Sequence, residues 1–328
     1  MLQPRIYLVG ITTVDVFLGQ ARLALPDEHA YLPAYKMTPG GSGANMAYSL
    51  ARLGARVHFC SRVGRDPAGR LARDFLHDAG VDVRSVQFDA SQTAFSCIGS
   101  DGAGRVGLLH FEGANDSISI DDVRWETLRT CGMLHIGGAM SMRSLDGGKM
   151  ALLLRTAKQR HDVATSLHTS RNTERKDALL PCLDRLDYLC TNDKEAKAIS
   201  GRSEVPDAAQ WFRDQGVGTV AITMGPSGSY VSAGRISACV PAVPVAAIDT
   251  TGCGDAFTAG FVYSALAGRS PLDCARWGNA LGSLCARTQG AMPEPFDLED
   301  VLGIVQRLGA GSASAAGRDI SCAGESRR

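Results

Sequence analysis

Short apolar segments alternate with segments of helical periodicity along most of this chain of 328 residues. Residues 5–11 and 56–64 are typical of buried strands, whereas residues 43–54 and 67–80 place apolar side chains at helical spacing and close on a glycine. The pattern recurs downstream, with strands expected at 132–138, 162–168, 186–192 and 218–225 and helices at 144–160, 193–200 and 208–216. Strands that alternate with helices predict a mainly parallel central sheet covered on both faces, which is a three-layer α/β/α fold.

Two segments break the alternation. Residues 15–37 contain short strand-like pieces, one of them at 29–37, with Pro and Gly between them. Residues 93–111 contain two apolar runs around a Ser-Asp-Gly-Ala-Gly turn, which indicates a hairpin. We expect both segments to form a small β-sheet that acts as a lid over a pocket, and ordinary loop decoration is the alternative.

The length suits one large domain or a domain with an appendage. The tail is rich in small and polar residues, so we expect it to be disordered. The expected boundaries are 1–14, 38–92 and 112–308 for the main α/β domain, 15–37 and 93–111 for the lid, and 309–328 for the tail.

The balance of charges argues against partners that bind a protein mainly through its net charge. The 34 Lys and Arg residues equal the 34 Asp and Glu residues, so we expect neither nucleic acid nor an anionic membrane as a partner. No apolar run is long enough to span a bilayer, and the N-terminal residues lack the features of a signal peptide. Ten cysteines without metal-binding spacing indicate reduced, mostly buried thiols and a cytoplasmic location.

Two glycines flank a cysteine at residues 252–254, and Asp255 follows where a helix is expected to begin. Backbone N–H groups at a helix N-terminus are unpaired and favour an anion, and glycine lets a phosphate approach them closely. Asp255 could therefore be a base beside an anion hole. The alternative is that its carboxylate only caps the helix.

Three further stretches are ambiguous when taken singly. The Gly-rich turn "PGGSGANMA" opens a helix and offers Asn45 as a two-way hydrogen-bond partner. Asn192 and Glu195 share one helix face and suit Mg²⁺ with retained waters, although a capping box would give the same pattern. Thr223 and Gly225 lie in a strand–turn–strand segment that could touch a nucleotide or be a plain hairpin turn.

The combination and order of these motifs resemble the PfkB-type carbohydrate kinases, the ribokinase-like family. The stretch "GGSGANMAYSLARLGARVHFCSRVGRDPAG" is similar to the N-terminal signature of that family, and "DTTGCGDAFTAGF" is similar to its C-terminal signature. "TNDKE" resembles its N-x-x-E motif. The resemblance runs from about residue 5 to residue 307 and implies a ribokinase-like fold with a small β-sheet lid.

The resemblance implies a role for each matching residue. Asp255 matches the catalytic base, and its neighbours Gly252, Cys253 and Gly254 match the anion hole for the transferring phosphoryl group. Substrate binding is implied for Asp15, Gly41 and Asn45, and nucleotide binding for Asn192, Thr223, Gly225, Gly228 and Asn279. Glu195 is implied to organise Mg²⁺ through water, and Asp249 and Gly290 lie where many relatives bind a monovalent cation, with K⁺ as the candidate.

The sequence departs from the family pattern at three places. Cys253 replaces the commoner alanine, which should be tolerated because backbone N–H groups do the work there. His168 stands where several sugar-kinase relatives carry an acidic residue, and residues 135–141 lack the sugar-binding glutamate of ribokinase itself. We expect His168 to lie near the nucleotide phosphates or the substrate, because it ends a parallel strand.

The implied function is ATP-dependent phosphorylation of a hydroxyl group on a sugar or sugar-like molecule, with ATP and Mg²⁺ as cofactors. A nucleoside kinase of the same fold is one alternative, and a non-catalytic sugar-binding regulator is another. We also expect a homodimer formed through the lid, because a bare edge strand is a liability that pairing relieves.

Overall fold

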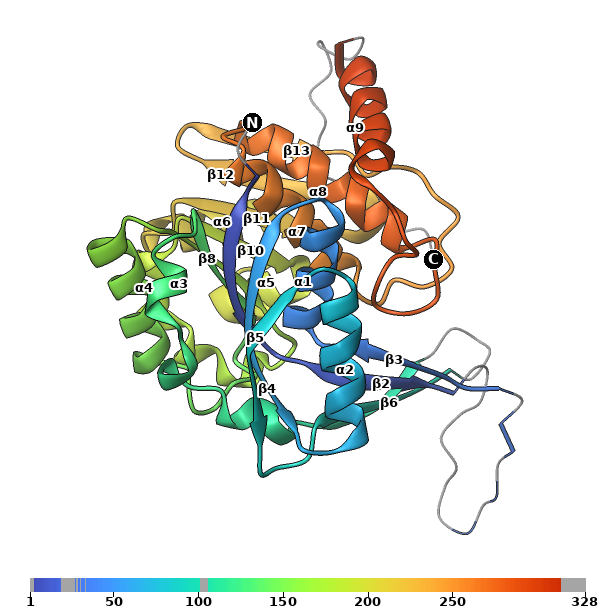
Figure 1. Ribbon diagram of the computed structural model, residues 1–328. Coiled ribbons are helices and arrows are strands. Elements are labelled where there is room, and N and C mark those ends of the chain that lie inside the picture. The colour runs from blue at the N-terminus through green and yellow to red at the C-terminus, as the bar shows by residue number, and fades with distance from the viewer. Residues whose placement is uncertain are drawn as a thin grey trace.

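The computed structural model describes residues 3–18, 27, 29, 31–32, 34–100 and 106–313. Its central feature is a nine-stranded sheet in the order β13-β12-β11-β10-β9-β8-β1-β4-β5 (Figure 1). The strands are β1 (Arg5–Gly10), β4 (Arg56–Gly64), β5 (Asp82–Asp89), β8 (Met133–Ala139), β9 (Ala164–Thr169), β10 (Tyr188–Asn192), β11 (Thr219–Thr223), β12 (Ser229–Ala233) and β13 (Ile236–Val240). All neighbours from β5 to β11 pair in parallel, and only β12 and β13 are antiparallel, so the expected mainly parallel sheet is confirmed.

Helices cover both faces of this sheet, as expected. They are α1 (Ser42–Arg52), α2 (Pro67–Asp78), α3 (Trp125–Leu128), α4 (Gly148–His161), α5 (Asp193–Ser200), α6 (Val205–Asp214), α7 (Cys253–Leu266), α8 (Pro271–Cys285) and α9 (Leu298–Ala313). Short 3₁₀ helices occupy Gly113–Ser117, Ile120–Asp122, Thr173–Ala178, Leu180–Arg185 and Gly225–Ser227. Alternate residues of β1 face opposite layers: Ile6 and Leu8 pack with α1, α7 and α8, whereas Tyr7 and Val9 pack with α4 and α6.

Local sequence signals set the helix boundaries. Asp66 precedes α2 and accepts a hydrogen bond of 2.8 Å from the backbone N–H of Gly69, while Pro67 occupies the first helical position. The helix ends just before Gly80, whose φ of 87° is accessible to glycine at little cost. The same combination of an N-terminal cap and a closing glycine bounds α5.

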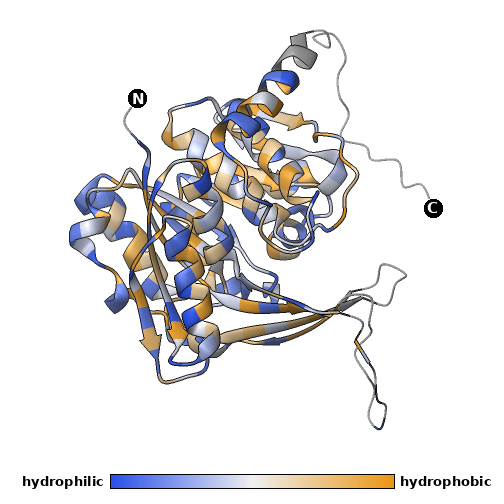
Figure 2. Cartoon of the chain, turned by 45° about the vertical axis from the view of Figure 1, so that its right-hand side comes forward, coloured by the Kyte–Doolittle hydropathy of each residue, from blue (hydrophilic) through white to orange (hydrophobic). Residues whose placement is uncertain are grey.

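A second, four-stranded sheet projects from the body of the protein (Figure 1). It comprises β2 (Thr13–Phe17), β3 (Lys36–Gly40), β6 (Ala94–Ser100) and β7 (Val106–Phe111) in the order β3-β2-β6-β7. The strands β2 and β6 are parallel and the other pairs are antiparallel. The expected small sheet is therefore confirmed, and its hydrophobic residues extend outside the body of the protein (Figure 2).

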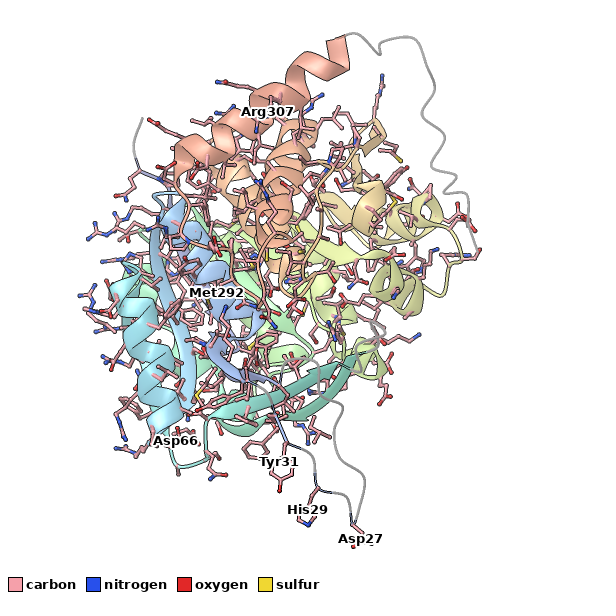
Figure 3. The ribbon with its side chains drawn as sticks, turned by 90° about the vertical axis from the view of Figure 1, so that its right-hand side faces the viewer. Asp27, His29, Tyr31, Asp66, Met292 and Arg307 are labelled. Atoms are coloured by element: carbon pink, nitrogen blue, oxygen red, sulfur yellow. The ribbon has the colours of Figure 1, made fainter. Side chains whose placement is uncertain are left out.

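The prediction of a strand at 29–37 is wrong in part. Residues 31–32 and 34–35 are not in a strand, and β3 begins only at Lys36. The sequence has a proline at position 33, which cannot donate a hydrogen bond to a neighbouring strand. Tyr31 is 96% exposed, and in Figure 3 Tyr31, His29 and Asp27 lie progressively farther from the body of the protein. The Asp-Gly-Ala-Gly part of the expected turn in 93–111 lies outside the described residues.

Two other expectations need correction. The helix α9 continues to Ala313, so the first part of the segment expected to be disordered is helical, and the rest of it lies outside the described residues. Continuing a helix that has already formed needs no new nucleus, so the small residues 309–313 can extend it in spite of their two glycines. Eight of the cysteines among the described residues are free thiols, but Cys239, on the outermost strand β13, is disulfide-bonded, so the expectation of reduced thiols is wrong for this residue. None of the described helices is long and apolar enough to cross a bilayer.

Candidate active site

The carboxylate of Asp255 lies at the start of α7 and is held from two sides. Nδ2 of Asn45, on α1, donates a hydrogen bond of 2.7 Å to Oδ2 of Asp255. Nδ1 of His168, on β9, lies 3.2 Å from Oδ1, which is an ion-pair distance, although the two groups are not aligned for a full hydrogen bond. Asp255 is only 8% exposed, so three elements that are distant in sequence converge on one nearly buried carboxylate.

The turn before α7 presents bare backbone to the same place. Gly252 has a φ of 74°, and a β-carbon there would collide with the carbonyl oxygen of Ala291, so only glycine fits. A β-carbon at Gly254 would meet only Nε2 of His168, at 3.9 Å. The N–H of Cys253 donates to the carbonyl oxygen of Thr250 at 3.3 Å, so the N–H groups of Gly252 and Gly254 are the ones left to hold an anion beside Asp255.

The Cys253 side chain points away from this space toward α8. It is half-buried, packs in the core cluster that contains Cys285, and its Sγ lies 3.9 Å from the carbonyl oxygen of Asp249. Hydrogen bonding with the Cys285 thiol lowers the pKa of Cys253. The cysteine in place of alanine thus puts no side chain into the space beside Asp255.

The surroundings of His168 shift the pKa of its imidazole, which the sequence did not reveal. Burial alone would lower the pKa of its imidazole, but contact with Asp255 and the more distant charge of Glu195 outweigh burial and raise this pKa above its usual value. The direct contact between His168 and Asp255 follows from the pairing of β9 with its neighbours, and no local pattern signals it.

Asn192 and Glu195 lie where β10 passes into α5. Oδ1 of Asn192 accepts a hydrogen bond of 2.8 Å from the backbone N–H of Glu195, so the helix cap is present. The Glu195 carboxylate is 7% exposed and accepts a hydrogen bond from the hydroxyl of Thr169. A buried carboxylate is thereby fixed at the carboxyl ends of β9 and β10, where α/β sheets bind ligands.

Asp15 belongs to a polar row across the small sheet. Strand register places Thr38, Asp15, Ser96 and His110 side by side on β3, β2, β6 and β7. Oδ1 of Asp15 accepts a hydrogen bond of 2.8 Å from Thr13. Burial raises the pKa of Asp15 and outweighs the hydrogen bonds that lower it.

The row continues into the main domain. His110 lies 3.1 Å from the hydroxyl of Ser96 and 3.4 Å from Glu112, and this acidic partner raises the pKa of His110. Nδ2 of Asn172 donates to Glu112 at 3.3 Å. The sequence analysis missed His110, Glu112 and Asn172, because strand pairing brings His110 to Ser96 beside Asp15, and only the packing of distant segments brings Asn172 to Glu112.

Two buried polar atoms near this row lack partners among the described residues: Oδ1 of Asn45 and Oγ1 of Thr38. Buried polar atoms normally have partners, so these two are available to hydroxyl groups of a ligand. Gly41, just before α1, has a φ of 90° and packs against the backbone of residues 11–13. The predicted substrate residues Asp15, Gly41 and Asn45 thus belong to adjoining segments.

The nucleotide-loop residues lie at the β11–β12 hairpin. Thr223 ends β11, and Gly225 and Gly228 flank the 3₁₀ turn with φ values of 57° and 91°. Asn279, on α8, uses Nδ2 to donate to the carbonyl oxygens of Val240 at 3.1 Å and Pro241 at 3.0 Å. Its amide nitrogen therefore ties α8 to the end of β13, a structural contact that the sequence did not predict.

Asp249 and Gly290 are brought together as expected. Oδ2 of Asp249 accepts a hydrogen bond of 3.0 Å from the N–H of Gly290, and Oδ1 accepts bonds from the N–H and hydroxyl of Thr251 at 2.9 and 2.7 Å. The carboxylate thus joins the loop before α7 to the loop after α8.

Related proteins have been found by sequence and by structure. The chain is 31% identical over 292 residues to an ATP-dependent ribose-1-phosphate kinase of Halopiger xanaduensis, covering 89% of this chain and 95% of that protein. It is 28% identical over 297 residues to a ribokinase of Haemophilus influenzae, covering 87% and 92%.

Among solved structures, Arabidopsis thaliana ribokinase with ribose and ATP is similar at a TM-score of 0.80 and 25% identity, covering 93% of this chain and 99% of that chain. An E. coli structure in complex with ATP and Mg²⁺ is similar in fold at a TM-score of 0.79 and 22% identity, with the same coverage. The family model described as pfkB family carbohydrate kinase matches residues 3–297. This match spans both sheets and the Asp255 site, and it shows that the chain belongs to the pfkB family of carbohydrate kinases.

Proposed function

We propose that this protein transfers the γ-phosphoryl group of ATP to a hydroxyl group of a sugar or sugar-like molecule, with Asp255 as the base. The observation that carries this assignment is the position of the Asp255 carboxylate beside the open N-terminus of α7, fixed by Asn45 and His168. Phosphoryl transfer depends on alignment, charge stabilisation and a base within reach of the acceptor.

The acceptor is assigned to the space between Asp255 and the small sheet. Asp15 supplies a carboxylate for hydroxyl groups, and Oδ1 of Asn45 and Oγ1 of Thr38 are buried acceptors without partners among the described residues. Gly41 allows the substrate to approach the backbone. A row of hydroxyl, imidazole and carboxylate groups suits a ligand that carries several hydroxyl groups.

The transferring phosphoryl group is assigned to the backbone of Gly252, Cys253 and Gly254, where the N–H groups of the two glycines are the donors and that of Cys253 already donates to Thr250. The adenosine portion of ATP is assigned to the hairpin that carries Thr223, Gly225 and Gly228 and to the neighbourhood of Asn279. Asn192 belongs to the phosphate end of this site, because it begins α5 beside Glu195.

Mg²⁺ is assigned to the space between Glu195 and the nucleotide phosphates. Across the described residues, no group of three or more His, Cys, Asp or Glu side chains could ligate a metal together. A single fixed carboxylate fits Mg²⁺ that keeps most of its waters and is held mainly by phosphates. When bound, the ion neutralises charge on the phosphate oxygens.

K⁺ is assigned to the loops joined by Asp249 and Gly290. A monovalent cation there would stabilise the loop that leads into the anion hole. Turnover measured in K⁺ against the same ionic strength of tetramethylammonium tests this assignment: equal rates in both salts would contradict it.

The small sheet is assigned as a lid that pairs with its copy in a homodimer. Its outer face carries the cross-strand row Met37, Val16, Cys97 and Leu109, of which Met37 is 48% and Leu109 is 60% exposed. Phe95 and Phe111 are also exposed, and β3 and β7 are the edge strands of the sheet as far as the structure describes it. A second copy would cover this apolar face. A cytoplasmic location remains a prediction from composition.

The direct test is ADP release with a panel of acceptors: ribose, ribose 1-phosphate, fructose and nucleosides. Turnover with a sugar supports the proposal, and exclusive turnover with nucleosides supports the nucleoside kinase alternative. If a folded, ATP-binding protein releases no ADP with any acceptor, the regulator alternative holds instead.

A further inference from the structure

We propose that His168 is a phosphoryl-binding residue whose imidazolium bridges the Asp255 carboxylate through Nδ1 and the transferring phosphoryl group through Nε2. This inference rests on the proposed kinase function and adds a cationic side chain to the anion site. The family resemblance did not assign such a role to position 168, where several relatives carry an acidic residue.

The two ring nitrogens of His168 face two different parts of the site, the Asp255 carboxylate and the turn at Gly254. Nδ1 lies 3.2 Å from Oδ1 of Asp255. Nε2 lies 3.9 Å from the position that a β-carbon at Gly254 would occupy, so it faces the turn assigned to the phosphoryl group. The His168 side chain is 12% exposed, which keeps this interaction in surroundings where water screens it little.

The charged neighbours of His168 favour its protonated form. Asp255 on α7 contacts it, and Glu195 on α5 interacts with it at longer range. Two further titratable side chains adjoin it. Cys190 on β10 is paired in register with His168, and burial raises the pKa of its thiol to about 12, so it is uncharged. His135 on β8 is fully buried, with Nδ1 3.0 Å from the hydroxyl of Ser166. Burial lowers the pKa of His135 well below its usual value, so this residue is uncharged and leaves two carboxylates to hold a proton on His168.

The protonation state decides what Nε2 can offer. A neutral imidazole that donates from Nδ1 to Asp255 presents a lone pair at Nε2, which repels a phosphoryl oxygen. The imidazolium donates from both nitrogens and places positive charge where negative charge develops.

The reaction remains balanced with this cation present. The acceptor O–H proton moves to Asp255, the acceptor oxygen forms a bond to the γ-phosphorus, and the bond to the ADP oxygen breaks. His168 keeps its proton and loses its carboxylate partner as Asp255 becomes neutral. The histidine is then free to interact more strongly with the phosphoryl group during transfer.

Two substitutions separate the two ring nitrogens. The amide nitrogen of His168→Asn approximates Nδ1, and that of His168→Gln approximates Nε2. His58→Asn is the matched control, because His58 forms another buried His–Asp pair, with Nδ1 2.8 Å from Asp82, near the opposite ends of the strands.

The pH dependence of kcat is the first readout. At pH 6.5 we expect kcat to fall roughly 10- to 100-fold in His168→Asn and less in His168→Gln, within the usual range for one charge-stabilising donor. The ratio of wild-type to variant kcat should shrink as pH rises and His168 loses its proton. A ratio that is constant with pH, or a loss equal to that of His58→Asn, would make His168 structural and overturn the proposal.

The second readout needs no acceptor. The imidazole pKa of His168 is measured by NMR in the wild-type protein, with its signal identified by its loss in His168→Gln, before and after addition of ADP, Mg²⁺ and aluminium fluoride. We expect this pKa to rise when the phosphoryl analogue is added and the pKa of His58 to stay constant. An unchanged pKa in an enzyme that turns over sugars overturns the His168 proposal alone, whereas a rise without turnover of any acceptor overturns only the kinase assignment.

Discussion

Asn45 and Asp255 lie 210 positions apart in the chain, and their side chains share a hydrogen bond of 2.7 Å. This bond links the first turns of α1 and α7, the two helices whose Gly-rich openings carry the acceptor and phosphoryl assignments. One amide therefore fixes the base and, through its free Oδ1, is able to orient the substrate.

Replacing Asp255 by Asn tests the base directly. The amide keeps the shape of the carboxylate but cannot take the proton of the acceptor hydroxyl. We expect Asp255→Asn to fold normally, to bind ATP and to lose at least roughly 10²-fold in turnover, or about 3 kcal/mol of transition-state stabilisation. Turnover, calorimetric ATP binding and circular dichroism check this.

Asp273→Asn is the control for a capping role, because Asp273 occupies the first turn of α8 as Asp255 occupies that of α7. It should leave turnover within a few-fold of the wild type. If Asp255→Asn behaves the same way while a substitution at Gly254 abolishes turnover, Asp255 is a helix cap and the loop alone is functional.

Cys253 should be dispensable for chemistry, because its sulfur packs in the core cluster with Cys285 and not in the anion site. We expect Cys253→Ala to keep most of the turnover and to resist inhibition by N-ethylmaleimide. The wild type should be inhibited, since the pKa of this thiol is lowered by Cys285 and a bulky adduct has no room at the start of α7.

Cys97→Ala provides the comparison, because Cys97 is also a half-buried free thiol but lies on the small sheet. It should remain sensitive to the reagent. An inactive Cys253→Ala variant with a normal fold would mean that the thiol itself takes part.

At neutral pH the Asp15 carboxylate should lower the free energy of unfolding, although it contributes to binding of the acceptor. Burial raises its pKa, so the folded state binds the proton more tightly than the unfolded state, and stability falls as pH rises through the folded pKa. We expect Asp15→Asn to gain stability relative to the wild type between acid and neutral pH, while the acceptor KM rises roughly 10- to 100-fold. Urea unfolding at several pH values and initial rates measure both.

Asp66→Asn should change the pH dependence of stability in the opposite direction to Asp15→Asn. Although burial opposes it, hydrogen bonds from Thr93 and Gly69 lower the pKa of Asp66. This carboxylate therefore stabilises the fold at neutral pH, and its contribution is lost as pH falls through the folded pKa. Parallel pH trends in the two variants would contradict the assignment of a raised pKa to Asp15.

The outer face of the small sheet should hold two subunits together. We expect the wild type to be a dimer by light scattering, and Leu109→Glu to weaken the dimer at least about tenfold by placing a charge in the apolar contact. Leu152→Glu, at an exposed leucine of α4, should not change the oligomeric state. A monomeric wild type with full activity at micromolar concentration would remove this proposal.

The sequence was most informative where the signal is local. The start of α2 at Pro67 and of α5 after Asn192 follow from capping chemistry, and the turn at 252–254 follows from its two glycines. The contact between His168 and Asp255 could not be read in this way, because it depends on how β9 and α7 meet in space. The same holds for His110, which reaches Ser96 only through the register of β6 and β7.

The burial of α7 has a consequence for hydrogen exchange. Every residue of α7 from Asp255 to Val262 is buried, including Gly260 where the helix touches α8. We expect amide protons there to exchange only when most of the domain opens, whereas those of the two edge strands of the small sheet should exchange through local openings. The base is thus anchored in the most slowly opening part of the protein, and the groups assigned to the acceptor belong to a part that can separate from it without global unfolding.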